Sequence, residues 1–360
     1  MTAHALPSTL QLPPHRSLLA LGAGSRMFGL DPATAVAVED LPAPLAEMLD
    51  ELGASVPTAE LVDRAVERGA DRRAAELLLS ELVASGLLVD SAHVQRRERR
   101  RAASTVVVDG SGPLAVGVVL GLATAGVGTV HVTASGPVLA ADLGTGFVDA
   151  DRGQDRATAI AAALARLRPS ARTGPPPQRT VPDLVVLADS ATPDPVRVAR
   201  LHAAGTPHLV VRVRDGVGVV GPLVLPGRST CLGCLEIERC AREPAWATAA
   251  AQLVGVPGQA GPACIAATAG LATAQALVAL DGPGSAAGPP ALEATLEIDP
   301  DAGTVTRRIW AAHPHCGCGA GRGGPGHGAD DMRGRSWSGH NRSVDGLPTR
   351  STHVPAEVPT

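Results

Sequence analysis

Four of the six cysteines in the sequence lie in two close pairs, and paired thiolates can hold a metal ion. The first pair stands in CLGC and the second in CGC, some eighty residues further along: Cys231, Cys234, Cys316 and Cys318. Four thiolates in two clusters match a tetrahedral zinc site with every position filled by protein, which holds structure and does no catalysis. His313 and His315 beside the second pair are alternative ligands, and a disulfide arrangement is the alternative use of the thiols.

The redox setting decides between zinc and disulfides. Pro7, Pro13 and Pro14 interrupt the N-terminal stretch where a secretory signal needs an apolar run after positive charge. The chain is therefore expected in the cytoplasm, where thiols stay reduced, and structural zinc is the expected cofactor.

Gly110 and Gly112, in VVVDGSGPLAVG, stand between an apolar run and an expected helix. Amide N–H groups at such a helix start can hold a phosphate, and a tight turn without a ligand is the equal alternative. An acid at the end of the next strand would hold a ribose, but that strand ends in Thr133, Ala134 and Ser135. This argues against ordinary NAD or ATP binding.

The elements that must position these residues alternate between strand and helix over residues 104–310. Apolar runs at 105–110, 129–134, 182–189 and 207–213 are expected strands, and the stretches at 114–126, 155–169 and 194–205 are expected helices. This alternation predicts an α/β domain with a parallel sheet wound on both faces. Residues 113–130 carry no charge, but their glycines and neighbouring strands favour a buried helix and strand over a membrane span.

A separate small module is expected ahead of this domain. Residues 1–25 are rich in Pro and His and are predicted to be irregular. Residues 26–92 hold two short strands around Asp31-Pro32, then three helices and a closing strand, an order that predicts a winged-helix-like module. Its helices carry as many acids as bases, which favours a peptide or protein partner over DNA.

Charge and composition describe the remaining segments. The basic run QRRERRR, within residues 93–103, is interpreted as a solvated linker, with a contact to nucleic acid or peptide as the alternative. Residues 320–360 are rich in Gly, Arg, His and Ser and are predicted to be a disordered tail. A formal net charge of −4 gives no basic face for a nucleic-acid partner.

Residues 104–318 resemble the ThiF/MoeB-type activating enzymes, which adenylate the C-terminus of a ubiquitin-like protein. The resemblance rests on the glycine loop, on DADRGQDRATAIAAALARLRP with Gly153 and Arg156, on PDLVVLADSATPDPVRVARLHAAG with Asp189 and Arg197, and on the paired cysteines. It implies a Rossmann-like domain over residues 104–319. The residues that it assigns to the nucleotide are Gly110, Gly112, Arg156 and Asp189.

The departures from that family argue against adenylation. Its ribose aspartate falls near Thr133, and its asparagine and arginine that contact ATP phosphates fall near Asp142 and Thr145. A lysine of its next helix is Gln154. Each lost charge-assisted contact would cost about 1.5–3 kcal/mol, so the nucleotide site is expected to be vestigial, without catalytic residues, and ATP with Mg²⁺ is a doubtful cofactor.

A narrower resemblance is to the cyclodehydratase C components, or leader-peptide-binding proteins, of azoline-forming peptide pathways. Their front module is a PqqD-like element that binds a precursor (leader) peptide as an extra strand for a separate YcaO-type enzyme. It implies that a peptide contacts the strands around Phe28, Leu30, Val36 and Val38 and the helix at 71–85. A homodimer is a further expectation.

Three alternatives stay open. The first is an ATP-dependent adenylyltransferase that activates a peptide or ubiquitin-like C-terminus through Arg156 and Asp189. The second is a winged-helix regulator, which would need a positive recognition helix that AELVDRAVERG does not provide. The third is a thioester role for Cys264, as in some activating enzymes, against which its apolar surroundings favour a buried structural cysteine.

Overall fold

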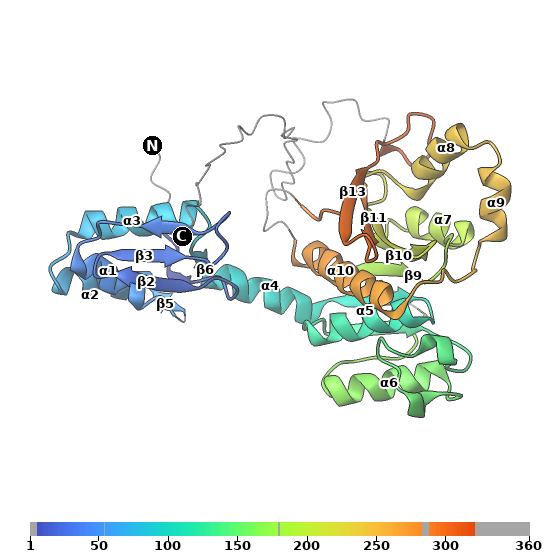
Figure 1. Cartoon of the computed structure of the whole chain (residues 1–360), viewed down its shortest axis with the longest axis horizontal. Coiled ribbons are helices and arrows are strands. Elements are labelled where there is room, and N and C mark those ends of the chain that lie inside the picture. Colours follow the sequence, from blue (N-terminus) through green and yellow to red (C-terminus); the bar gives the residue numbers. More distant parts are fainter. Residues whose placement is uncertain (1–5, 54, 179–180, 283–287, 321–360) are drawn as a thin grey trace, which may run out of the picture. The chain divides into compact units, whose positions relative to one another are not determined.

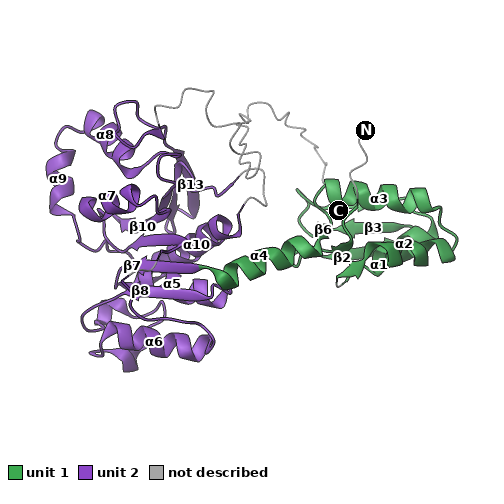
Figure 2. Cartoon of the chain, turned by 180° about the vertical axis from the view of Figure 1, so that it is seen from behind, with its two compact units in different colours: residues 1–104 green, residues 105–360 purple. Residues whose placement is uncertain are grey.

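The structure is a computed structural model, which describes residues 6–53, 55–178, 181–282 and 288–320. The chain forms two compact units, residues 1–104 and residues 105–360 (Figure 2). The predicted tail lies outside the described residues except for Ala320.

The described residues of unit 1 form two three-stranded sheets and four helices (Figure 1). One sheet has the order β5-β1-β6: β1 (Thr9–Gln11), β5 (Val56–Pro57) and β6 (Val89–Asp90). The other has the order β2-β3-β4: β2 (Leu18–Gly22), β3 (Ser25–Phe28) and β4 (Val36–Val38). The helices are α1 (Ala43–Asp50), α2 (Thr58–Glu67), α3 (Arg72–Ala84) and α4 (Ser91–Ala103).

Two expectations for unit 1 differ from the structure. Residues 1–25 are not irregular throughout, because they include β1 and β2, and Leu10 of β1 is completely buried in the core of the unit. The partners of β1 come from residues 56–57 and 89–90, so the pairing depends on contacts distant in sequence. The stretch at 93–103 is helical, since Asp90 accepts a hydrogen bond from the Ala92 amide and caps the start of α4.

Unit 2, over the residues that the structure describes, is built on a seven-stranded sheet with the order β13-β12-β11-β10-β9-β7-β8. Its strands are β7 (Thr105–Asp109), β8 (Thr129–Thr133), β9 (Leu184–Ala188), β10 (His208–Arg214), β11 (Val217–Val224), β12 (Ala294–Asp299) and β13 (Thr304–Ile309). Strands β8, β7, β9 and β10 are parallel, as predicted. The other three are antiparallel, so the sheet is mixed rather than wholly parallel. The change begins at the tight turn of Asp215 and Gly216, which both have positive φ.

Helices cover both faces of this sheet. They are α5 (Pro113–Thr124), α6 (Arg156–Leu167), α7 (Pro195–Ala203), α8 (Leu232–Arg242), α9 (Trp246–Gln252) and α10 (Pro262–Asp281), with short 3-10 turns at Ala140–Asp142 and Asp149–Asp151. The core on one face takes side chains from α5, α6 and α10, and the smaller cluster on the other takes Leu201 of α7 and Leu232 of α8. α5 is almost entirely buried, which confirms the expected core helix in residues 113–130.

Helix α10 packs closely against α5. A Cβ added at Gly121 would lie 2.5 Å from the Thr273 hydroxyl, so glycine is needed there for the two helices to approach. In the part of the chain that the structure describes, α10 is the one helix long and apolar enough to cross a membrane, but half of its apolar window is buried within the unit. The core helix of a globular protein has the same property.

Candidate functional site

The parallel strands β7, β8 and β9 end at one cavity of about 430 Å³. Ligands of open α/β sheets bind outside the carboxyl ends of such strands, so this cavity is where the resemblance places a nucleotide. The charged side chains that line it are Asp109, Asp142, Arg156, Asp189, Asp194 and Arg197. The structure therefore brings together all four nucleotide-site residues expected from the sequence, Gly110 and Gly112 included.

Asp189 occupies the helix start that would otherwise hold a phosphate. Its carboxylate accepts hydrogen bonds from the amides of Gly112 at 2.8 Å, Leu114 at 3.0 Å and Ala115 at 3.4 Å. The backbone at Asp189 has φ of +69°, a left-handed conformation that Asp tolerates better than most residues. The chain itself thus supplies the anion for the N-terminus of α5.

The two glycines of the loop make room for this carboxylate. A Cβ added at Gly110 or at Gly112 would lie 2.7 Å from an oxygen of Asp189. A glycine pattern typical of phosphate binding is here explained by close packing against an acidic side chain. Burial raises the pKa of Asp189, the neighbouring Asp142 raises it further, and the three amide donors oppose that rise.

Both arginines of the cavity are paired with its own acids. Arg156 donates to Asp142 at 2.6 Å in a largely buried ion pair. Arg197 donates to Asp109 at 2.8 Å, and Thr133, at the expected ribose position, donates to the same carboxyl group at 2.8 Å. Each guanidinium already has a carboxylate partner, so binding a triphosphate would require it to leave that partner.

The lining of the cavity has more acidic than basic side chains. Four aspartates and two arginines give it a formal charge of −2. ATP carries negative phosphates, and its transfer chemistry needs placed positive charge. Asp109 is not among the site residues that the sequence predicts. The signal available was its position as the last residue of β7, directly before the glycine loop.

The four paired cysteines form one buried cluster in unit 2. Their sulfur atoms lie within 4.8 Å of one another, with separations of 3.8 Å for Cys231–Cys234 and 3.6 Å for Cys231–Cys316 and Cys234–Cys318. A disulfide would need about 2.0 Å, whereas a tetrahedron with zinc–sulfur bonds of about 2.3 Å has edges of about 3.8 Å. The cluster can hold a tetrahedral metal ion.

Neighbouring groups agree with a closed, all-cysteine site. Among the described residues, neither His313 nor His315 belongs to the cluster. A Cβ added at Gly233, between the first two cysteines, would lie 3.2 Å from the sulfur of Cys316. Burial raises the pKa of the Cys231 thiol, so a bound cation would have to stabilise its thiolate.

The four residues expected to contact a peptide do not share one environment. Phe28 has no exposed surface and belongs to the core of unit 1, so a direct contact from its ring is excluded. Leu30 and Val36 are 67% and 41% exposed, and Val38 is half-buried. β4, which carries Val36 and Val38, is an edge strand of its sheet.

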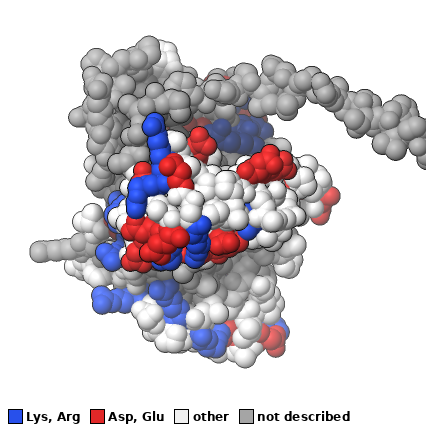
Figure 3. Space-filling model, turned by 90° about the vertical axis from the view of Figure 1, so that its left-hand side faces the viewer, with Lys and Arg blue, Asp and Glu red and all other residues white. Residues whose placement is uncertain are grey.

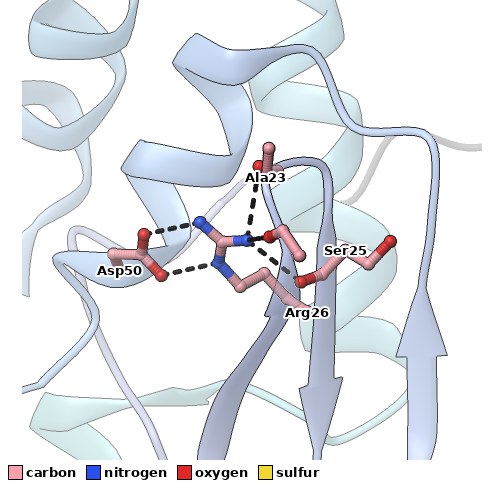
Figure 4. Close-up of polar contacts among 5 residues, drawn as sticks. Ala23, Ser25, Arg26 and Asp50 are labelled. Atoms are coloured by element: carbon pink, nitrogen blue, oxygen red, sulfur yellow. Dashed lines mark hydrogen bonds and ion pairs between the residues drawn. The ribbon is translucent and has the colours of Figure 1, made fainter.

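An ion pair fastens that sheet to α1. Figure 4 shows the buried Arg26 of β3 donating to both carboxylate oxygens of Asp50, each at 2.6 Å, and to carbonyl groups of the β2–β3 turn. On the face drawn in Figure 3, arginines and acids lie intermixed rather than in one basic area.

Cys264 lies on α10 with 4% of its surface exposed, and its sulfur faces the Thr268 hydroxyl at 3.9 Å. A thioester with a partner needs an accessible thiolate. The position supports the structural interpretation of this cysteine.

Comparison with known proteins shows which solved structures share this fold. No protein-family model matches the chain, and no curated protein matches it in sequence. Among solved structures, Escherichia coli MccB with ATP matches with a TM-score of 0.66 at 14% identity, over 86% of this chain and 99% of MccB. The chain has the fold of MccB. The resemblance to the ThiF/MoeB-like superfamily is therefore confirmed as a likeness of fold.

Further structures agree. The microcin C7 biosynthetic enzyme MccB in complex with N-formylated MccA matches with a TM-score of 0.65 at 14% identity, over 86% of this chain and 99% of that one. PaaA matches with a TM-score of 0.58 at 13% identity, over 83% of this chain and 99% of PaaA. A coverage of 86% is more than unit 2 alone could supply, so the MccB-like fold extends into unit 1.

Proposed function

We propose that this chain is a ThiF-like scaffold that binds a precursor peptide or partner protein and does not adenylate it. The observation that carries the proposal is the carboxylate of Asp189 on the α5 amides, in a cavity whose two arginines are already paired. No residue of the chain is assigned a catalytic role. ATP and Mg²⁺, doubtful cofactors from the sequence, would have no role in such a scaffold.

The peptide would bind unit 1. Three helices with β5 between the first two and β6 after the third follow a winged-helix-like order, and the edge strand β4 offers unpaired backbone groups for an added strand. The exposed side chains of Leu30 and Val36 supply apolar contacts, while the buried Phe28 supports the sheet beneath them. MccB with bound MccA supports a peptide ligand for this fold.

Zinc would hold the cysteine cluster as a structural ion. The four ligands are Cys231, Cys234, Cys316 and Cys318. The ion would fasten the start of α8 to the segment that follows β13, and with four protein ligands it would leave no position open for a substrate.

The modifying enzyme would be a separate cytoplasmic protein such as a YcaO-type cyclodehydratase, and the scaffold would act as a homodimer.

A peptide-display selection tests the peptide role. Random 12-residue peptides are selected on the full chain, and the affinity of the best one is measured by fluorescence anisotropy. Leu30→Asp with Val36→Asp should weaken that affinity at least tenfold, because charge replaces exposed apolar surface beside the edge strand. Leu139→Asp, at an exposed leucine of unit 2, is the matched control and should bind normally. Equal affinity of all three proteins would contradict the assignment.

The alternative is an adenylyltransferase acting on a peptide or ubiquitin-like C-terminus, which MccB with ATP favours. It would need Asp189 to leave the α5 amides and Arg156 to leave Asp142. ATP–pyrophosphate exchange in the presence of the selected peptide would detect it.

A further inference from the structure

A second cavity, of about 200 Å³, lies between α8 and the sheet face formed by β10 to β13. Its charged lining comprises five arginines and four glutamates: Arg212, Arg214, Arg239, Arg242, Arg308, Glu236, Glu238, Glu243 and Glu297. Trp310 and Thr295 complete the polar and aromatic wall.

Strand register places Arg212 at the inner wall of this cavity. Arg212 of β10 pairs with Val219 of β11, which pairs with Glu297 of β12, so the three side chains form one row across the sheet. Alternate residues of a strand face the same side of the sheet. The side chain of Arg212 therefore lies on the same face as that of Val210, which belongs to the core cluster that includes Leu232 of α8. Arg212 is only 9% exposed.

Four of the five arginines have a carboxylate partner. Arg214 and Arg308 lie 3.9 Å and 3.3 Å from Glu297. On α8, Arg239 pairs with Glu243 at 3.6 Å and Arg242 pairs with Glu238 at 2.5 Å.

Arg212 is the exception. Its Nη1 donates to the Ala191 carbonyl at 3.3 Å, while its Nε is buried without a partner, and no described acid lies within ion-pair distance of its guanidinium. Glu236, the remaining acid of the lining, accepts from Trp246 instead.

Burying a charged guanidinium without a counter-ion costs free energy, and this cost favours the neutral form and lowers the pKa of the group. Burial, together with the charge of Arg214, lowers the pKa of Arg212 to about 10. Glu236 and Glu297 act in the opposite direction, but neither lies within ion-pair distance of Arg212. At neutral pH the group still carries its positive charge, so the wall of the cavity holds a cation without a direct ion-pair partner. A planar fork of N–H donors is matched to carboxylate and phosphate oxygens.

We infer that this cavity binds a small oxyanion, a carboxylate or a phosphate group, through Arg212. The bound anion would accept from the guanidinium N–H groups of Arg212 that line the cavity and would offset its charge. The site is separate from the cavity at the glycine loop and independent of the proposed peptide role.

Calorimetry on the full chain tests the inference, with inorganic phosphate and succinate as probes and ionic strength held constant with KCl. The wild type should bind one of them saturably, phosphate if the site takes phosphate groups and succinate if it takes carboxylates. Arg212→Met should weaken that binding at least tenfold. The melting temperature of this variant without ligand should equal or exceed that of the wild type, because a buried charge without an ion-pair partner has been removed. Arg152→Gln, at an exposed arginine of unit 2 that is paired with Asp149 and does not line this cavity, should bind within twofold of the wild type.

Two results would overturn the inference: no saturable binding of either probe to the wild type, or unchanged affinity in Arg212→Met. If that variant does not fold, the wild type decides by NMR. A slowly exchanging arginine Nε–H signal should shift saturably with the probe that binds, and a signal that stays fixed with both probes excludes the site.

Discussion

Asp189 is the residue on which the nucleotide question depends. Its carboxylate fills the α5 amide site, and Gly110 and Gly112 provide the space for it. In a nucleotide-binding enzyme the same glycines would give room to a phosphate. The glycine loop alone could not separate the two cases, because both need close approach to the backbone.

Replacing Asp189 with Ala should free those amides. The free energy of unfolding should fall by about 1–3 kcal/mol, since buried donors lose their acceptor. Inorganic phosphate should bind at the freed amides of α5, a place where the wild type binds no phosphate. Chemical denaturation and phosphate calorimetry, in the Arg212→Met background to remove the second oxyanion site, measure both effects. Asp194→Ala, which removes only the cap of α7 at the same cavity, should cost about 1 kcal/mol and gain no phosphate binding. Loss of an ATP affinity in Asp189→Ala would instead support the adenylyltransferase.

The cysteine cluster gives a second prediction for single residues. Cys231→Ser should reduce bound zinc from one ion per chain to almost none, and the protein should lose much of its stability because the metal-binding free energy contributes to folding. Cys240→Ser is the matched control, because Cys240 lies on the same helix, α8, but outside the cluster. Elemental analysis measures the metal. Equal zinc content in both variants would refute the site.

The contact between α1 and α2 in unit 1 gives a pH-dependent prediction. Glu51 follows α1 and lies 2.7 Å from Arg64 of α2, with Arg68 as a second partner. Burial acts to raise the pKa of Glu51, but hydrogen bonds from Arg68 and Arg64 outweigh it and lower the pKa. A lowered pKa means that the carboxylate stabilises the folded state above its unfolded pKa and loses this effect as pH falls through the folded value.

Glu51→Gln should therefore lower the free energy of unfolding by about 0.5–1 kcal/mol at pH 7, a modest amount because the pair is partly exposed. The difference between wild type and variant should shrink below about pH 4.5, the ordinary pKa of the group. Urea denaturation at pH 7 and at pH 3.5 measures it. A difference that is equal at both pH values would show that the ion pairs are not its origin.

Elements with strong local patterns could be predicted from the sequence, and those that depend on distant partners could not. Runs such as LVVLA at β9 and the helical stretch of α6 were expected at their observed places. β1 was missed because it is three residues long and pairs with strands 45 and more residues away. The cluster of four cysteines could be predicted because a tetrahedral metal site needs four ligands and two close pairs supply them. The pairing of Asp142 with Arg156 could not be predicted, since no local sequence pattern specifies it. Arg212 carried a weak signal, a single arginine within the apolar run LVVRV.

At the scale of the whole molecule, the two units have separate cores. The four cysteines all belong to unit 2, so a metal chelator should lower the melting temperature of that unit alone. Differential scanning calorimetry of the full chain should then show two transitions, of which one moves with chelator and the other moves with Glu51→Gln. A single transition that responds to both changes would mean that the units unfold together.

The central claim is that the cavity at the glycine loop is closed to nucleotides by the carboxylates of the chain itself. Calorimetry of the full chain with ATP and Mg²⁺ tests it most directly, on Arg212→Met protein whose zinc content has been determined in the same preparation. The account predicts one zinc ion per chain and no ATP binding at millimolar nucleotide. Micromolar ATP binding by protein with one zinc ion would contradict it, because Asp189 and Asp142 would then have to release the α5 amides and Arg156 to the nucleotide.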